Sequence, residues 1–172
     1  MLSIDIRTLE SRAVQVAGEL PADDPVWQEG DPLPEDSVTV TGRLSTAGPG
    51  RFYFTGRLEA TVLGECRRCL VEVRTDVSEE VHLFFMETGV EGAEDDAETY
   101  LIDPRAHAID LRPAIREHWL LGVPAYAECR EDCKGLCPTC GADLNAGECA
   151  CAHTADSRWD ALRKLRSNAE QA

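Results

Sequence analysis

The sequence predicts an α+β fold in which a curved antiparallel β-sheet or partial barrel carries a packed helix, a cysteine-rich segment and a C-terminal helix. Three observations support this: stretches of alternating apolar and polar residues, one segment with apolar residues every four positions, and six of the eight cysteines within residues 129–151. We therefore divide the chain into a β-rich domain (1–125), a Cys-rich segment (126–153) and a C-terminal amphipathic helix (154–172).

Alternating apolar and polar residues predict three strands, at residues 37–45, 51–63 and 71–85. Such a period of two is typical of antiparallel strands with one buried face. The glycines and the proline of residues 46–51 predict a turn between the first two strands. The third stretch is too long for one flat strand, so we expect a bend or bulge near residues 75–79. One or two further strands are indicated by Ile4, Ile6, Val14 and Val16.

The helix of the β-rich domain is predicted at about residues 110–121. Asp110 suits the N-cap position, and Pro113 falls in the first turn, where its missing N–H does no harm. Gly122 and Pro124 predict where the helix ends. The apolar residues that recur every four positions, and should face the sheet, are Leu111, Ile115 and Trp119. A similar apolar pattern predicts the C-terminal helix, with Trp159, Leu162 and Leu165 on one face.

The net charge of -15 is concentrated in two acidic segments, residues 19–36 and 87–103, each with seven acids and no base. Such segments are usually solvated, mobile loops, although they can also bind a basic protein. The sequence has no run of about 18 apolar residues, so we expect no membrane span. The first residues lack a basic stretch followed by an apolar one, so we expect no signal peptide and a cytoplasmic protein.

The cysteines have three interpretations: disulfides, redox catalysis and metal binding. Disulfides are disfavoured because a reducing cytoplasm keeps thiols free, and because the predicted strands contain no cysteine to cross-link. Redox catalysis by Cys66 and Cys69 is disfavoured because this pair lies between two strands rather than before a helix. Zinc is favoured because C-x-x-C pairs supply thiolates to a tetrahedral ion, and the chain has two such pairs plus four more cysteines.

The preferred pairing places eight cysteine ligands around two Zn²⁺ ions. One site would consist of Cys137, Cys140, Cys149 and Cys151, and the other of Cys66, Cys69, Cys129 and Cys133. The second set would tie a hairpin tip to the chain that leaves the helix. An exchange of pairs between the sites, or a single zinc site with idle thiols, stays open, and His153 is a weaker candidate ligand.

No motif of a catalytic site is present in the sequence. We find no H-E-x-x-H, no G-x-S-x-G and no glycine-rich phosphate loop. Catalytic zinc usually has three protein ligands and an open position, whereas eight cysteines would fill two closed sites. We therefore expect a protein that is not an enzyme and has no small-molecule substrate.

Four motifs together resemble a known family. In chain order they are "CRRCL", "IDLRPAIREHWLLGVP", "CREDCKGLCPTCGADLNAGECAC" and "DSRWDALRKL". They are similar to those of the YceD family of large ribosomal RNA subunit accumulation proteins. The resemblance implies a bacterial factor for 23S ribosomal RNA accumulation and large-subunit assembly, whose partner is ribosomal RNA, a large-subunit ribosomal protein or another assembly factor.

Two modes of action follow from the charges. Direct RNA binding needs basic side chains that contact phosphates, and the candidates are Arg67, Arg68, Arg158, Arg163, Lys164 and Arg166. Arg130 and Lys134 also lie among the cysteines and could offset the negative charge of the thiolates. The alternative is a zinc-stabilised adaptor that binds a basic protein through its acidic loops without touching RNA.

Overall fold

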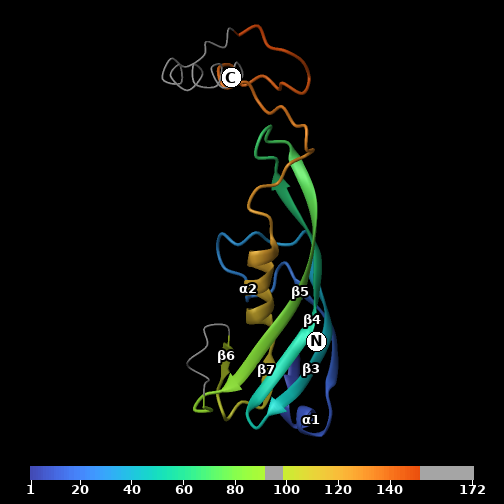
Figure 1. Ribbon diagram of the computed structural model, residues 1–172, viewed down its shortest axis with the longest axis vertical. Coiled ribbons are helices and arrows are strands. Elements are labelled where there is room, and N and C mark those ends of the chain that lie inside the picture. The colour runs from blue at the N-terminus through green and yellow to red at the C-terminus, as the bar shows by residue number, and fades with distance from the viewer. Residues whose placement is uncertain (92–98, 152–172) are drawn as a thin grey trace, which may run out of the picture.

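The computed structural model describes residues 1–91 and 99–151, and in this part the chain forms two β-sheets and two helices (Figure 1). A five-stranded sheet has the order β2-β3-β4-β5-β6, and a two-stranded sheet pairs β1 with β7. The elements are β1 (Ser3–Asp5), α1 (Ile6–Ser11), β2 (Val14–Pro21), β3 (Ser37–Gly48), β4 (Arg51–Glu65), β5 (Glu72–Glu87), β6 (Thr99–Ile102), β7 (Ala108–Asp110) and α2 (Arg112–Gly122).

The large sheet is an open antiparallel meander from β2 to β5, with β6 added parallel to β5 at the edge. The predicted sheet is thus confirmed in its main part, while the parallel edge strand was not foreseen. Of the bend or bulge expected near residues 75–79, the bulge is wrong: β4 and β5 stay in one register from Arg51–Met86 to Glu65–Glu72. The two strands instead twist together along their length (Figure 1), and the register shift lies between Thr46 and Gly48 in β3.

The N-terminal residues form one short strand and one short helix before β2. The prediction of further strands is confirmed for β1 and β2, but α1 was missed. Asp5 ends β1 and accepts a hydrogen bond of 2.8 Å from the backbone N–H of Arg7, which satisfies a free donor in the first turn. Leu9 of α1 is buried in the core, so this short helix closes one end of the sheet.

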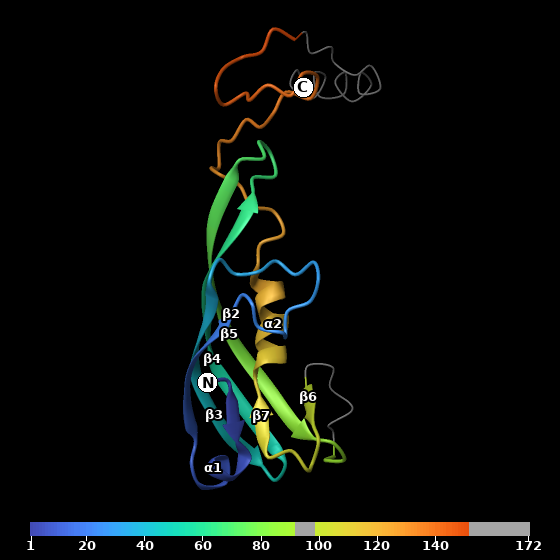
Figure 2. The same cartoon turned by 180° about the vertical axis from the view of Figure 1, so that it is seen from behind.

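Helix α2 lies across one face of the sheet (Figure 2) and supplies the centre of the core. The predicted face is confirmed, since Leu111, Ile115 and Trp119 are all fully buried. The N-cap position is taken by Leu111 rather than Asp110, but the Asp110 carboxylate still accepts a hydrogen bond from the backbone N–H of Arg112 at 3.1 Å. The helix ends at Gly122, as its sequence predicts.

The first acidic segment is held against α2 rather than free in solvent. Arg116 binds Asp31 through two hydrogen bonds, of 2.7 and 2.8 Å, and the pair is largely buried. The indole N–H of Trp119 donates to the carbonyl of Pro32 at 2.6 Å, and Glu35 pairs with Arg74 of β5. The expectation of a solvated loop is therefore wrong for this segment, because several of its acids and carbonyls have partners in α2 and β5.

Beyond α2, the hairpin of β4 and β5 projects as a two-stranded ribbon, and residues 126–151 meet its tip (Figures 1 and 2). This part of the chain is almost free of regular secondary structure. The predicted C-terminal helix, residues 154–172, and much of the second acidic segment lie outside the described residues. No helix in the described part is long and apolar enough to cross a membrane.

Candidate metal centres

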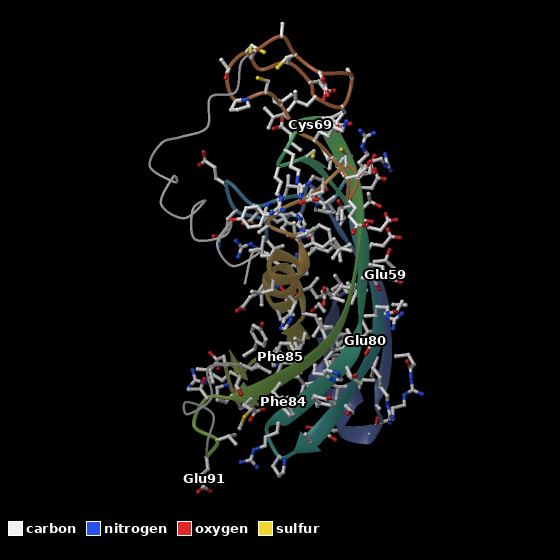
Figure 3. All side chains as sticks on the ribbon, turned by 45° about the horizontal axis from the view of Figure 1, so that its top comes forward. Glu59, Cys69, Glu80, Phe84, Phe85 and Glu91 are labelled. Carbon is white, nitrogen blue, oxygen red and sulfur yellow. The ribbon has the colours of Figure 1, made fainter. Side chains whose placement is uncertain are left out.

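The eight cysteines come together in two groups of four. The upstream centre consists of Cys66, Cys69, Cys129 and Cys133, and the downstream centre of Cys137, Cys140, Cys149 and Cys151. Within each group all four sulfur atoms lie within 4.8 Å of one another. This is the grouping of the preferred pairing scheme, and Figure 3 shows the sulfurs at the ribbon tip, near the labelled Cys69, and in the loop beyond it.

The spacing of the sulfurs suits a tetrahedral ion. The sulfur atoms of Cys66 and Cys133 are 3.8 Å apart, and those of Cys69 and Cys129 are 3.6 Å apart. Four thiolates at about 2.3 Å from a central Zn²⁺ would be separated by about 3.8 Å. The residues therefore fit a closed four-thiolate site, in which bound zinc supplies cross-linking rather than an open coordination position.

Each centre begins with the same backbone turn. In the upstream turn, the N–H of Leu70 donates to the carbonyl of Cys66 at 2.9 Å, and the N–H of Cys66 donates to Val71 at 2.8 Å. The downstream turn repeats both bonds at the same lengths, from Gly141 to Cys137 and from Cys137 to Ala142. A C-x-x-C sequence folded in this way presents both sulfurs on one side, ready for one ion.

The residue after each C-x-x-C pair has a positive φ, 60° at Leu70 and 73° at Gly141. Glycine adopts this conformation without cost, whereas a leucine there is strained. Leu70 is the one residue other than glycine with a positive φ in the described part of the chain. The upstream turn thus has the geometry of a zinc turn but an unfavourable residue at its last position.

Backbone hydrogen bonds join the upstream turn to the Cys-rich segment. The N–H of Arg67 donates to the carbonyl of Ala127 at 2.9 Å, and the N–H of Leu136 donates to the carbonyl of Arg68 at 3.0 Å. Gly135 is needed here, because a Cβ at this position would lie 2.8 Å from the Arg68 carbonyl oxygen. The hairpin tip and residues 127–136 thus form one unit around the four sulfurs.

Arg67 and Arg68 both have partners within this unit. They form ion pairs with Glu128 at 2.5 and 3.3 Å. Arg68 also donates to the carbonyl of Cys133 at 2.9 Å, and the Arg67 guanidinium lies over the ring of Tyr126. These two arginines therefore fix the path of the chain around the upstream centre. The other candidate RNA contacts, Arg158, Arg163, Lys164 and Arg166, lie outside the described residues, as does His153.

The backbone favours the thiolate form of the first cysteine in each centre. The Cys129 N–H is the main group that lowers the pKa of the Cys66 thiol to about 6, and the Cys140 N–H has the same effect on the pKa of Cys137, also to about 6. Conversely, desolvation and the neighbouring sulfurs raise the pKa of Cys129 to about 12. The thiolate is the form that binds metal, and a divalent cation among the sulfurs would offset the repulsion between thiolates.

Asn145 connects the two centres. It lies in the loop between Cys140 and Cys149, yet its side-chain NH₂ points at the sulfur of Cys133 at 3.5 Å. Its side-chain oxygen accepts hydrogen bonds from the backbone N–H of Lys134 and the guanidinium of Arg130, both at 2.8 Å. Neither Asn145 nor Glu128 was predicted as a site residue, because their roles depend on contacts that the spacing of the cysteines does not reveal.

One family model covers the region that contains both centres. The family model described as large ribosomal RNA subunit accumulation protein YceD matches residues 54–166. An uncharacterized protein of Mycobacterium tuberculosis is 37% identical over 115 residues, which are 64% of this chain and 54% of that protein. An uncharacterized protein of Mycobacterium leprae is 33% identical over 93 residues, 52% of this chain and 41% of that protein.

A plant protein extends these similarities. The chloroplastic YCED homolog 1 of Arabidopsis thaliana, a large ribosomal RNA subunit accumulation protein, is 35% identical over 69 residues, 40% of this chain and 22% of that protein. The chain spans about half the length of the first mycobacterial relative, 54% of it. No solved structure matches the chain significantly.

Proposed function

The chain belongs to the YceD family of large ribosomal RNA subunit accumulation proteins, and from this membership we propose that it is a zinc-binding factor that supports 23S ribosomal RNA accumulation and assembly of the large ribosomal subunit. The observation that carries the proposal is the family match over residues 54–166, which includes all eight cysteines. The name of the Arabidopsis relative, a large ribosomal RNA subunit accumulation protein, supports the same role.

Zinc would act as a structural cross-link in this proposal. An ion bound by all four sulfurs of a centre, which lie within 4.8 Å of one another, would have no open coordination position for a substrate. Structural zinc is worth about 10–16 kcal/mol in small zinc domains, which is comparable to the whole stability of a typical domain. The Cys-rich segment contributes no large aliphatic or aromatic side chain to the hydrophobic core among its described residues, so its fold would depend on the metal. We therefore propose a factor that acts by binding, without enzymatic activity, in the cytoplasm.

The partner is ribosomal RNA or a protein of the large subunit. Direct RNA contact would rely mainly on the basic residues near the C-terminus, since Arg67 and Arg68 already have intramolecular partners. Contact through a basic protein is favoured by the net charge of -15. The first acidic segment offers less of this charge than its composition suggests, because Asp31 and Glu35 are paired with arginines.

Deletion of the gene tests the proposed role. The expected result is a lower ratio of 23S to 16S ribosomal RNA and fewer mature large subunits on sucrose gradients, both restored by the wild-type chain. An unchanged ratio and gradient in the deletion strain would contradict the proposal. A control variant with Leu121→Ala should restore both, since this side chain is 76% exposed and is not one of the candidate metal ligands.

Recovery of partners from cell extract separates the two modes of action. The tagged protein is purified with and without nuclease treatment, and bound RNA and proteins are identified. Loss of the partners on nuclease treatment indicates direct RNA contact, whereas recovery of a basic large-subunit protein in both samples indicates an adaptor. Changing Arg163 and Arg166 to Glu should reduce the salt dependence of binding in the first case and leave it unchanged in the second.

A further inference from the structure

The tip of the β4–β5 hairpin carries a groove that the metal centres do not use. We call it the tip groove, and it is lined by Leu63, Gly64, Glu65, Leu70 and Glu72. The groove lies beside the upstream centre, because Cys66 follows Glu65 directly and Cys69 precedes Leu70. Figure 3 shows the tip near the labelled Cys69, at the far end of the ribbon from Phe84.

Two apolar side chains are exposed in the tip groove. Leu63 is 42% exposed and Leu70 is 59% exposed. Leu63 lies in strand β4 and Leu70 in the turn after Cys69, yet both line the same depression. Contiguous exposed apolar surface can mark an interaction site, whereas single exposed apolar residues are common, so the backbone and the charges of this groove must also indicate one.

The backbone at Leu70 is unfavourable for a leucine. Its φ of 60° is the conformation that Gly141 adopts at the equivalent position of the downstream turn. A non-glycine residue in this region costs about 1–2 kcal/mol. The leucine side chain gains little burial within the chain, so its apolar surface is left for a contact outside the described residues.

The charges of the tip groove are also unfavourable within the chain. Glu65 and Glu72 are directly opposite in the β4–β5 register, and both are exposed. Like charges opposite each other on neighbouring strands are destabilising. Neither side chain has a hydrogen-bond or ion-pair partner among residues 1–91 and 99–151, whereas the nearby Arg67, Arg68 and Arg74 are all paired.

We propose that the tip groove binds a basic protein segment in which an apolar side chain adjoins lysine or arginine residues. The apolar side chain would lie between Leu63 and Leu70, and the cations would neutralise Glu65 and Glu72. RNA is a poor fit, because its phosphates would meet two unpaired carboxylates. We take the segment to belong to a basic protein of the large ribosomal subunit. Only this choice of source rests on the proposed function.

Photocrosslinking in growing cells tests the proposal. Leu63 is replaced by p-benzoylphenylalanine, and the same replacement at Gln15, exposed on the far edge of the sheet, is the control. The expected product is a crosslink from position 63, absent from position 15, to a large-subunit protein at a peptide with lysine or arginine beside an apolar residue. A crosslink to RNA, to a second copy of the chain, or to the same proteins from both positions overturns the proposal, as does no crosslink.

Two variants separate binding from folding. Leu70→Gly relieves the strained backbone, so it should keep the metal content and a Tm no lower than that of the wild type, while the crosslink yield falls about tenfold. Glu65→Lys should reduce the yield by a similar factor, whereas Glu59→Lys, the same charge change on the same strand (Figure 3), should not. Unchanged yields in the first two variants contradict the proposal.

The proposal about the tip groove and the proposed function can be tested separately. If Leu70→Gly and Glu65→Lys restore 23S ribosomal RNA fully in the deletion strain, and Cys66→Ser does not, the groove is not the binding surface and the role in subunit assembly stands. If deletion of the gene leaves 23S ribosomal RNA unchanged, the proposed function is wrong. In that case, a crosslink to a basic protein outside the ribosome would still support the tip groove as a binding site, and only the identity of the partner would change.

Discussion

The side-chain amide of Asn145 lies 3.5 Å from the sulfur of Cys133, so a residue from the loop of the downstream centre contacts a ligand of the upstream centre. Hydrogen bonds to ligating atoms orient them and adjust metal affinity, typically by about 10–100-fold. The two centres are therefore linked by more than the short chain between Cys133 and Cys137.

Asn145→Ala should weaken metal binding at the upstream centre by about tenfold, because Cys133 loses its donor and Lys134 and Arg130 lose their acceptor. Chelator competition on the zinc protein measures the affinity, and the ¹¹³Cd resonances of the cadmium-loaded protein show which centre changes. Asn145→Asp is the matched variant: it keeps the acceptor but replaces the donor with a charged oxygen beside Cys133 and Asp143, so it should weaken binding at least as much as the Ala variant. Two unchanged resonances in both variants would show that Asn145 does not act on the upstream centre.

Cys137→Ser should reduce the zinc content from two ions to one and unfold the downstream loop while the sheet stays intact. Cys66→Ser should also leave one ion, but it should lower the Tm, because the upstream centre ties the β4–β5 hairpin to residues 127–136. Native mass spectrometry counts the ions, and hydrogen exchange locates the unfolding. A full zinc count in either variant would refute the assignment of that cysteine as a ligand.

Asp31→Asn should lower the Tm at neutral pH, because the charged pair with Arg116 is lost. The hydrogen bonds from Arg116 hold the pKa of Asp31 below its usual value. A carboxyl group whose pKa is lower in the folded state stabilises the fold at any pH above its pKa in the unfolded state, about 4. This stabilisation is lost as the pH falls through the pKa of the folded state. The difference in Tm between the variant and the wild type should therefore shrink below about pH 4. Asp23→Asn, at an exposed position of the same loop, should show no such difference.

Trp119→Ala should destabilise the protein by about 3–5 kcal/mol, as expected for the loss of a fully buried aromatic side chain. Trp119→Phe keeps most of the packing and removes the hydrogen bond to the Pro32 carbonyl, so it should cost about 1–2 kcal/mol. Urea unfolding measures both values. Leu121→Ala, on the exposed side of the same helix, should stay within about 0.5 kcal/mol of the wild type. Equal losses in the Phe and Ala variants would show that the hydrogen bond, not the ring, dominates.

The sequence patterns correctly predicted the strands, the buried face of the helix and the cysteine turns, because each of these depends on the spacing of residues that are close in the chain. Alternation gave the positions of β3, β4 and β5, and the four-residue spacing of Leu111, Ile115 and Trp119 identified the buried face of α2. The C-x-x-C pairs identified the cysteines that form turns, and the preferred pairing has the grouping seen in the structure. Zinc itself stays a prediction.

Other features depend on contacts between distant residues, so spacing does not reveal them. The attachment of the first acidic segment requires Asp31 to meet Arg116, which is 85 positions away. A strand of the length of β5 can avoid a bulge when its partner twists with it, and the parallel edge strand β6 follows a segment without a clear pattern. The strain at Leu70 became visible only beside the equivalent glycine of the downstream turn.

The β4–β5 ribbon also fixes the distance between the cysteine-bearing tip and the opposite end of the sheet. Strand β4 has 15 residues, and at about 3.4 Å per residue its two ends are roughly 50 Å apart. One end carries the tip with the upstream cysteines, and the other lies beside the small β1–β7 sheet and α1 (Figures 1 and 2). Under the proposed function, a ribbon of this length would let the protein contact two places on a ribosomal particle that a sphere of the same mass could not reach together. The number of residues in the two strands determines this distance. Removing two residues from each strand would shorten the ribbon by about 7 Å and would leave every remaining side chain on its original face of the sheet.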